Sequence, residues 1–140
     1  MTVASGNSEV SNWVSYLIAL IRGCVGAIIG GVVGYALFQW ILRQGFRAEA
    51  IPGALVGAGF GLLSGKRSWI LGLVAGILGS MWGIVVEWRF FPFADDESFA
   101  YFIANLHQKP QIVLIALGVG SLVAFWLGLG ADFSKRRTGV

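Results

Sequence analysis

Residues 69–86 read WILGLVAGILGSMWGIVV, a stretch without Asp, Glu, Lys or Arg. Its glycines recur every three or four residues, which places them on one side of an α-helix, with Ile70, Leu73 and Ile77 on the other sides. A hydrocarbon core about 30 Å thick takes roughly 20 apolar residues in a helix. The stretch therefore predicts a transmembrane helix. It does not predict a barrel strand, in which apolar and polar residues would alternate.

The whole chain has the composition of an integral membrane protein. Of its 140 residues, 56% are hydrophobic and only 12% are charged, and the mean hydropathy is +0.77. Soluble domains carry roughly twice that charge fraction. The composition excludes a disordered chain, the single cysteine excludes a disulfide-stapled secreted domain, and the net charge of +3 is too small and scattered for a nucleic-acid surface.

Charge-free runs on both sides of this stretch predict an all-α integral membrane protein that forms one domain over residues 1–140. The predicted transmembrane helices are residues 23–42, 50–64, 69–86 and 111–131. The second is only about 22 Å long as a helix, so it lies in thinned bilayer, borrows residues from its ends or is re-entrant. We expect a full crossing.

Small residues recur on one face of every predicted span. Lipid gives no hydrophobic driving force for helix association, so close backbone contact at small residues has to provide it. The residues expected at these contacts are Gly30, Gly34, Gly53, Gly57, Gly61, Gly72, Gly76, Gly79, Gly83, Gly120 and Gly128. One interpretation is a glycine-packed bundle within one monomer, and the other leaves one face for a homo-oligomer or a larger membrane complex.

The basic residues of the short connections suggest an orientation. With four crossings, the side of the N-terminus holds six bases against four on the other side. The bias favours a protein of a bacterial cytoplasmic membrane with cytoplasmic N- and C-termini. Residues 12–22 form either an amphipathic helix at the interface or an extension of the first span.

The connection between the third and fourth spans predicts an amphipathic interfacial helix over residues 95–107. Phe99, Phe102, Ile103 and Leu106 share one face, and three acids, residues 95–97, occupy the expected first turn. A metal site that combines these acids with His107 is the alternative. We expect no metal and no cofactor, because eleven residues on one helix separate Asp96 from His107 by roughly 16 Å.

Glu87 is the acid that directly follows the third span. Arg43 and Arg47 in the first connection are expected on the same side of the membrane. The sequence therefore predicts a structural ion pair of Glu87 with these arginines, and a proton-relay role is the alternative.

The sequence favours a noncatalytic function. It contains no serine elbow, no paired His and carboxylate, no Cys and His cluster and no phosphate loop. We therefore expect a scaffold or accessory subunit, embedded in the lipid bilayer, that associates through glycine-rich helix faces. The alternative is a small oligomeric channel or transporter. It is less favoured because selective pores need polar groups near the membrane centre, and the spans offer few.

Overall fold

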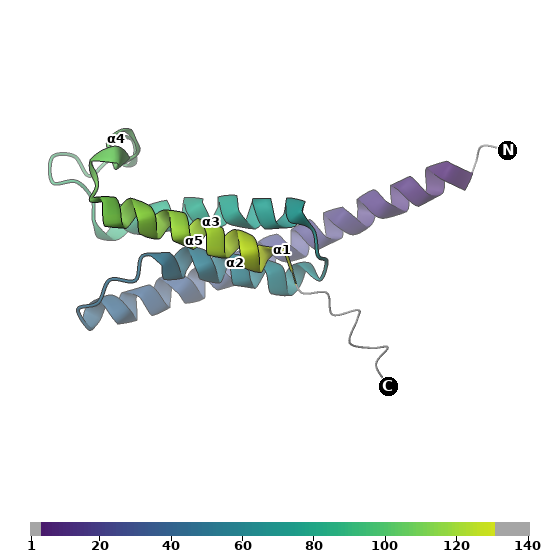
Figure 1. Ribbon diagram of the computed structural model, residues 1–140, viewed down its shortest axis with the longest axis horizontal. Helices are drawn as coiled ribbons and strands as arrows, with labels where there is room; N and C mark the ends of the chain where they lie inside the picture. The colour runs from purple at the N-terminus through teal and green to yellow at the C-terminus, as the bar shows by residue number, and fades with distance from the viewer. Residues whose placement is uncertain (1–3, 131–140) are drawn as a thin grey trace.

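The computed structural model describes residues 4–130, with side chains from residue 9 onward (Figure 1). Its helices are α1 (Ala4–Arg43), α2 (Ala50–Ser64), α3 (Trp69–Phe90), α4 (Phe99–Ala104) and α5 (Gln111–Gly128), with a 3₁₀ turn, η1, at Leu106–Gln108. No strand occurs in this part of the chain. The prediction of an all-helical protein is confirmed.

Three of the helices are long and apolar enough to cross a membrane. They are Glu9–Arg43 within α1, Trp69–Phe90 and Gln111–Gly128. The fourth apolar helix, α2, has the predicted bounds but only 15 residues. These three helices are compatible with an integral membrane location.

The helix ends differ from the predicted spans in several places. Helix α1 runs unbroken through residues 12–22, so this segment extends the first span. Helix α3 continues past residue 86 to Phe90, because no helix-breaking residue precedes Pro92. Helix α5 ends at Gly128, and the predicted end at residue 131 lies outside the described residues.

Helix α2 lies at the centre of the bundle and packs against α1, α3 and α5. The chain runs up and down, so α1 and α3 are parallel to each other and antiparallel to α2 and α5 (Figure 1). Ala27 of α1, Val56 and Phe60 of α2, and Leu71 and Ala75 of α3 form the buried core. At the end of α2, Gly65 adopts a left-handed conformation with φ +64°, which lets the chain reverse into α3.

The start of α2 is recessed from one end of the bundle. Gly34 of α1 lies against Pro52, and Gly120 of α5 lies against Ala50. From those contacts, α1 continues to Arg43 and α5 reaches back to Gln111, which is about 13 Å along each helix axis. The recessed end of α2 therefore lies between longer neighbours.

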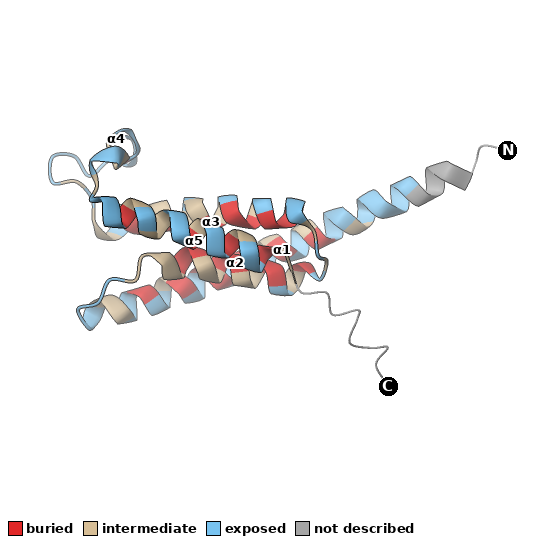
Figure 2. Cartoon of the chain, in the orientation of Figure 1, coloured by how far each residue is buried: buried red, intermediate tan, exposed pale blue. Residues whose placement is uncertain are grey.

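The residues between the helices are buried and much of the outer surface is exposed (Figure 2), and many large apolar side chains lie on that outer surface. Ile28 of α1, Met81 of α3 and Trp126 of α5 are 68%, 60% and 75% exposed. Water would make such a surface costly, whereas acyl chains are as apolar as these side chains. The exterior is therefore compatible with a protein surrounded by lipid.

The helix predicted over residues 95–107 is much shorter in the structure. Ser98 is the N-cap of α4 and accepts a hydrogen bond from the Tyr101 N–H at 3.3 Å. Asp96 precedes the helix and accepts from the Ser98 N–H at 2.8 Å. Helix α4 then ends at Ala104, and Asn105 separates it from η1. The three acids are thus outside the helix, because the Asp96 side chain and the Ser98 cap take backbone N–H groups that a longer helix would use.

Candidate functional site

A polar cluster lies at the end of the bundle where α2 is recessed. Glu87 is in the last turn of α3, and Lys109 comes two residues before α5. Lys109 Nζ lies 3.5 Å from Glu87 Oε1, and the two side chains are only 11% and 3% exposed. The buried ion pair therefore connects the end of α3 to the start of α5.

Lys109 has further contacts that hold it in this position. Its ammonium donates a hydrogen bond to the Phe91 carbonyl oxygen. The same group lies 4.8 Å from the ring centroid of Phe93 and 5.1 Å from that of Phe102. Because an ammonium is attracted to the face of an aromatic ring, these contacts fix Lys109 between the connection and α3.

The predicted ion pair of Glu87 with Arg43 and Arg47 is wrong. Among the described residues, the ion pair of Glu87 is with Lys109. The Arg47 guanidinium lies 4.4 Å from the ring centroid of Phe91, and Arg43 is exposed at the end of α1. The connection after α3 folds back over Glu87 and brings Lys109 closer than the arginines of the first connection.

One oxygen of the Glu87 carboxylate has no hydrogen-bond partner. Its Oε2 atom is buried, and no donor of the described residues reaches it. A buried carboxylate is costly unless it is paired and hydrogen-bonded. Glu87 and Lys109, which we call the clasp, thus join α3 to the connection after it. Lys109 provides the positive charge that balances the Glu87 carboxylate.

Each of the predicted contact glycines lies against a neighbouring helix of the same chain. A Cβ placed at Gly57 would lie 2.5 Å from the Ala124 carbonyl oxygen, and one at Gly61 would collide with the Leu127 carbonyl. Gly30 meets the Leu55 carbonyl, and Gly34 meets Pro52. Neighbouring backbone leaves no space for a side chain at Gly30, Gly57 and Gly61, and at Gly34 a Cβ would lie in a tight contact, 3.1 Å from Pro52 Cα.

The glycines of α3 meet α5 in a different way. Gly72 faces Leu129, Gly76 faces Phe125, and Gly83 faces Leu117. Large side chains of α5 and of Leu129, just after it, thus pack against these three glycines of α3. The remaining predicted contact residues also lie between helices: Gly53 is near Gly79 and Gly120, Gly79 near Ala124, Gly120 near Ala50, and Gly128 near Ala75.

The sequence interpretation missed two close contacts, at Gly26 and Gly59. Each would place a Cβ against the carbonyl of the other, across the α1 and α2 interface. Gly59 lies outside the four-residue repeat of α2, which faces α5, so the repeat gave no sign that a second glycine face exists. The signal was the extra Gly59 between Gly57 and Gly61.

Two serines provide the polar contact at the middle of α3 and α5. Ser80 Oγ donates to the Gly76 carbonyl at 2.8 Å and is hydrogen-bonded to Ser121 Oγ. Ser80 thus has a partner on its own helix and one on the neighbouring helix. These hydrogen bonds join α3 to α5 near the middle of both helices.

The described residues give no cluster of three or more His, Cys, Asp or Glu side chains that could hold a metal ion. In particular, the acids before α4 and His107 in η1 belong to separate short turns. No protein-family model matches the chain, and neither a curated protein nor a solved structure shows a match to it.

Proposed function

We propose that the chain is a noncatalytic multi-pass membrane protein that acts as a scaffold or accessory subunit and binds a partner along the first half of α1. The partner is a second copy or a helix of a larger membrane complex. The observation that carries this proposal is the length of α1 compared with the membrane.

The described part of α1 that contains an apolar span, Glu9–Arg43, has 35 residues. At the usual rise it is about 52 Å long, roughly 20 Å more than a typical hydrocarbon core. Its first turns extend past the ends of α2, α3 and α5 (Figure 1), whereas Ser15 contacts Lys66 and Ala19 packs in the core. The charge-free run of this helix, residues 23–42, matches the hydrocarbon core, so the apolar side chains before Arg22 require tilt, bilayer deformation or a partner to cover them.

One face of this first half is apolar and uncovered. Val10, Val14, Ile18 and Ile21, which we call the arm face, are between 49% and 63% exposed. Their spacing of four, four and three residues places them in one stripe. The glycines of α1 that meet α2 lie on another side, so the arm face is available for a partner.

The glycines support association by the arm face and not by a glycine face. All eleven predicted contact glycines lie against helices of their own chain. Their close contacts support the proposal that glycine packing holds the bundle together, since small residues are what allows membrane helices to approach closely. A partner would therefore meet the larger side chains.

The position of α2 supports four crossings. Helix α2 touches three neighbours, and Leu62 is its one clearly exposed large side chain among residues 50–64. A helix surrounded by protein need not match the bilayer thickness by itself, because its neighbours cover its ends. The end of the bundle with Arg22, Lys66 and Arg67 would be cytoplasmic, as the positive-inside rule favours in a bacterial membrane.

The test replaces Val14 and Ile18 together by Ser and measures the mass of the purified protein in mild detergent. We expect the unaltered chain to run as an assembly larger than its 15.0 kDa. The arm variant should raise the dissociation constant by about tenfold or more, since truncating two packed apolar side chains costs at least about 1.4 kcal/mol.

The control replaces Val119 and Leu122 by Ser on α5, where both side chains are also exposed. This variant should keep the assembly intact. A monomeric unaltered chain without any co-purifying protein, or equal loss in both variants, would contradict the proposal.

A further inference from the structure

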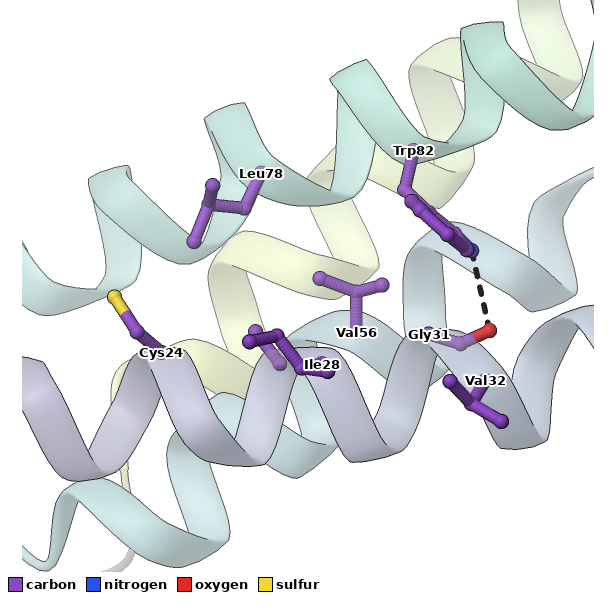
Figure 3. Close-up of a pocket in the computed structure, with 8 residues that line it drawn as sticks. Cys24, Ile28, Gly31, Val32, Val56, Leu78 and Trp82 are labelled. Atoms are coloured by element: carbon purple, nitrogen blue, oxygen red, sulfur yellow. Dashed lines mark hydrogen bonds between the residues drawn. The ribbon is translucent and has the colours of Figure 1, made fainter.

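Two apolar cavities lie between α1 and α3. The first, of about 380 Å³, is lined by Trp13, Tyr16 and Leu20 of α1 and by Ile70 and Val74 of α3. The second, of about 300 Å³, is lined by Cys24 and Ile28 of α1, Leu78 and Trp82 of α3, and Val56 of α2 (Figure 3). Both volumes lie at the lower end of the range for small-molecule sites.

The two cavities follow each other along the same pair of helices. Leu20 and Cys24 are one turn apart on α1, and Val74 and Leu78 are one turn apart on α3. These four side chains all pack against one buried core. The two cavities thus lie end to end along α1 and α3, and we call the pair the α1/α3 groove.

A hydrogen bond closes the deep end of the groove. Trp82 Nε1 on α3 donates to the Gly31 carbonyl of α1 at 3.2 Å (Figure 3). From Tyr16 to Gly31 the groove is about 22 Å long along α1, whereas one leaflet contributes roughly half of the 30 Å hydrocarbon core. The groove can therefore hold a single acyl chain over the full depth of a leaflet.

A cation lies at the open end of the groove. Lys66, in the turn between α2 and α3, donates from Nζ to Ser15 Oγ at 2.7 Å. The same atom lies 3.9 Å from the ring centroid of Tyr16, whose side chain lines the first cavity. An ammonium has three N–H donors, so Lys66 can still donate to a ligand here. Trp13 and Trp69, 73% and 65% exposed, lie near the same end, where aromatic side chains favour the headgroup region.

We propose that the α1/α3 groove binds one anionic phospholipid, with an acyl chain in the two cavities and the headgroup phosphate on Lys66. The apolar lining matches an acyl chain, and the cation at its mouth matches a phosphate with net negative charge. A helix of a second copy, about 10 Å wide, is too broad for cavities of this size.

Native mass spectrometry of the full chain in mild detergent tests the proposal. The probes are phosphatidylglycerol, phosphatidylcholine and diacylglycerol with the same acyl chains. We expect phosphatidylglycerol to bind about fivefold more tightly than phosphatidylcholine, as one lysine near a headgroup gives, and diacylglycerol to bind most weakly.

Variants separate the headgroup contact from the groove. Lys66→Gln should remove the preference for phosphatidylglycerol, and the control Arg67→Gln, at an exposed neighbouring position, should keep it. Val74→Phe fills the first cavity and Ile28→Trp the second, so each should lose bound lipid of both classes. Ile28 is 68% exposed, so its variant remains informative if Val74→Phe fails to fold.

Equal binding of phosphatidylglycerol and phosphatidylcholine to the unaltered chain would overturn the proposal. So would an intact preference in Lys66→Gln, or unchanged lipid binding in a folded Val74→Phe or Ile28→Trp variant. A dimer that excludes lipid from the unaltered chain would assign the groove to a second copy instead.

Discussion

At Gly57 the chain has no room for even one methyl group. The nearest atoms are backbone atoms of Ala124, which cannot move aside as a flexible side chain could. Gly118 on α5 is the opposite case, because it is exposed and a Cβ there would meet nothing within 4 Å. A substitution at Gly57 therefore tests helix packing, whereas one at Gly118 tests only the effect of glycine on the stability of the helix backbone.

Substitution of each glycine by Ala should change stability in opposite directions. Gly57→Ala should lower the unfolding free energy by about 1–3 kcal/mol, the usual cost of overpacking. Gly118→Ala should raise it by up to about 1 kcal/mol, because Ala is the better helix former. Thermal unfolding in detergent measures both, and a Gly57→Ala protein at least as stable as the unaltered chain would refute the packing role.

The sequence predicted which glycines lie between helices better than which helix each one faces. The repeat of Gly53, Gly57 and Gly61 indicated one small face on α2, whereas Gly59 lies on a second face toward α1. Periodicity describes one helix at a time. The choice of neighbour depends on how three helices surround α2, and no local pattern contains that information.

At the scale of elements, the long helices were predictable and the connection after α3 was not. Long charge-free runs give strong signals, and α2 has the predicted bounds. Over residues 95–107 the apolar period was present, but Ser98 and Asn105 cap a helix of only six residues. Side-chain caps at both ends prevailed over periodicity, because each satisfies backbone groups that a longer helix would use.

Because the fold of this connection was not predicted, the sequence did not indicate that Lys109 is the partner of Glu87. Replacing Lys109 by Met should lower the unfolding free energy by about 3–5 kcal/mol, since it leaves a buried carboxylate without its counter-charge. Replacing Glu87 by Leu in that variant should recover most of the loss, because the unpaired charge is then gone. Denaturant titration in detergent measures the differences.

The control for the clasp is Arg47→Met. Arg47 is exposed and lies over Phe91, so its removal should cost less than about 1 kcal/mol. If Arg47→Met destabilises the protein as much as Lys109→Met, the arginine and not the lysine balances the charge of Glu87.

On the scale of the whole molecule, the outside is more apolar than that of a soluble protein. Glycines and alanines pack between the helices together with Phe60 and Leu71, whereas many isoleucine, leucine and tryptophan side chains are exposed. This arrangement is favourable only in a solvent that accepts large apolar groups. It supports the central claim that α2, although short, crosses the membrane as the middle helix of a four-helix bundle.

Labelling of single cysteines in sealed, oriented vesicles tests this claim most directly. In a Cys24→Ala background, Gln44→Cys lies before α2 and Arg67→Cys lies after it, both at exposed positions. Asp95→Cys, in the connection after α3, is the control expected to share a side with Gln44→Cys. A membrane-impermeant maleimide should label residues 44 and 95 from one side of the membrane and residue 67 only from the other. Labelling of residues 44 and 67 from the same side would mean that α2 does not cross, and the four-span bundle would be wrong.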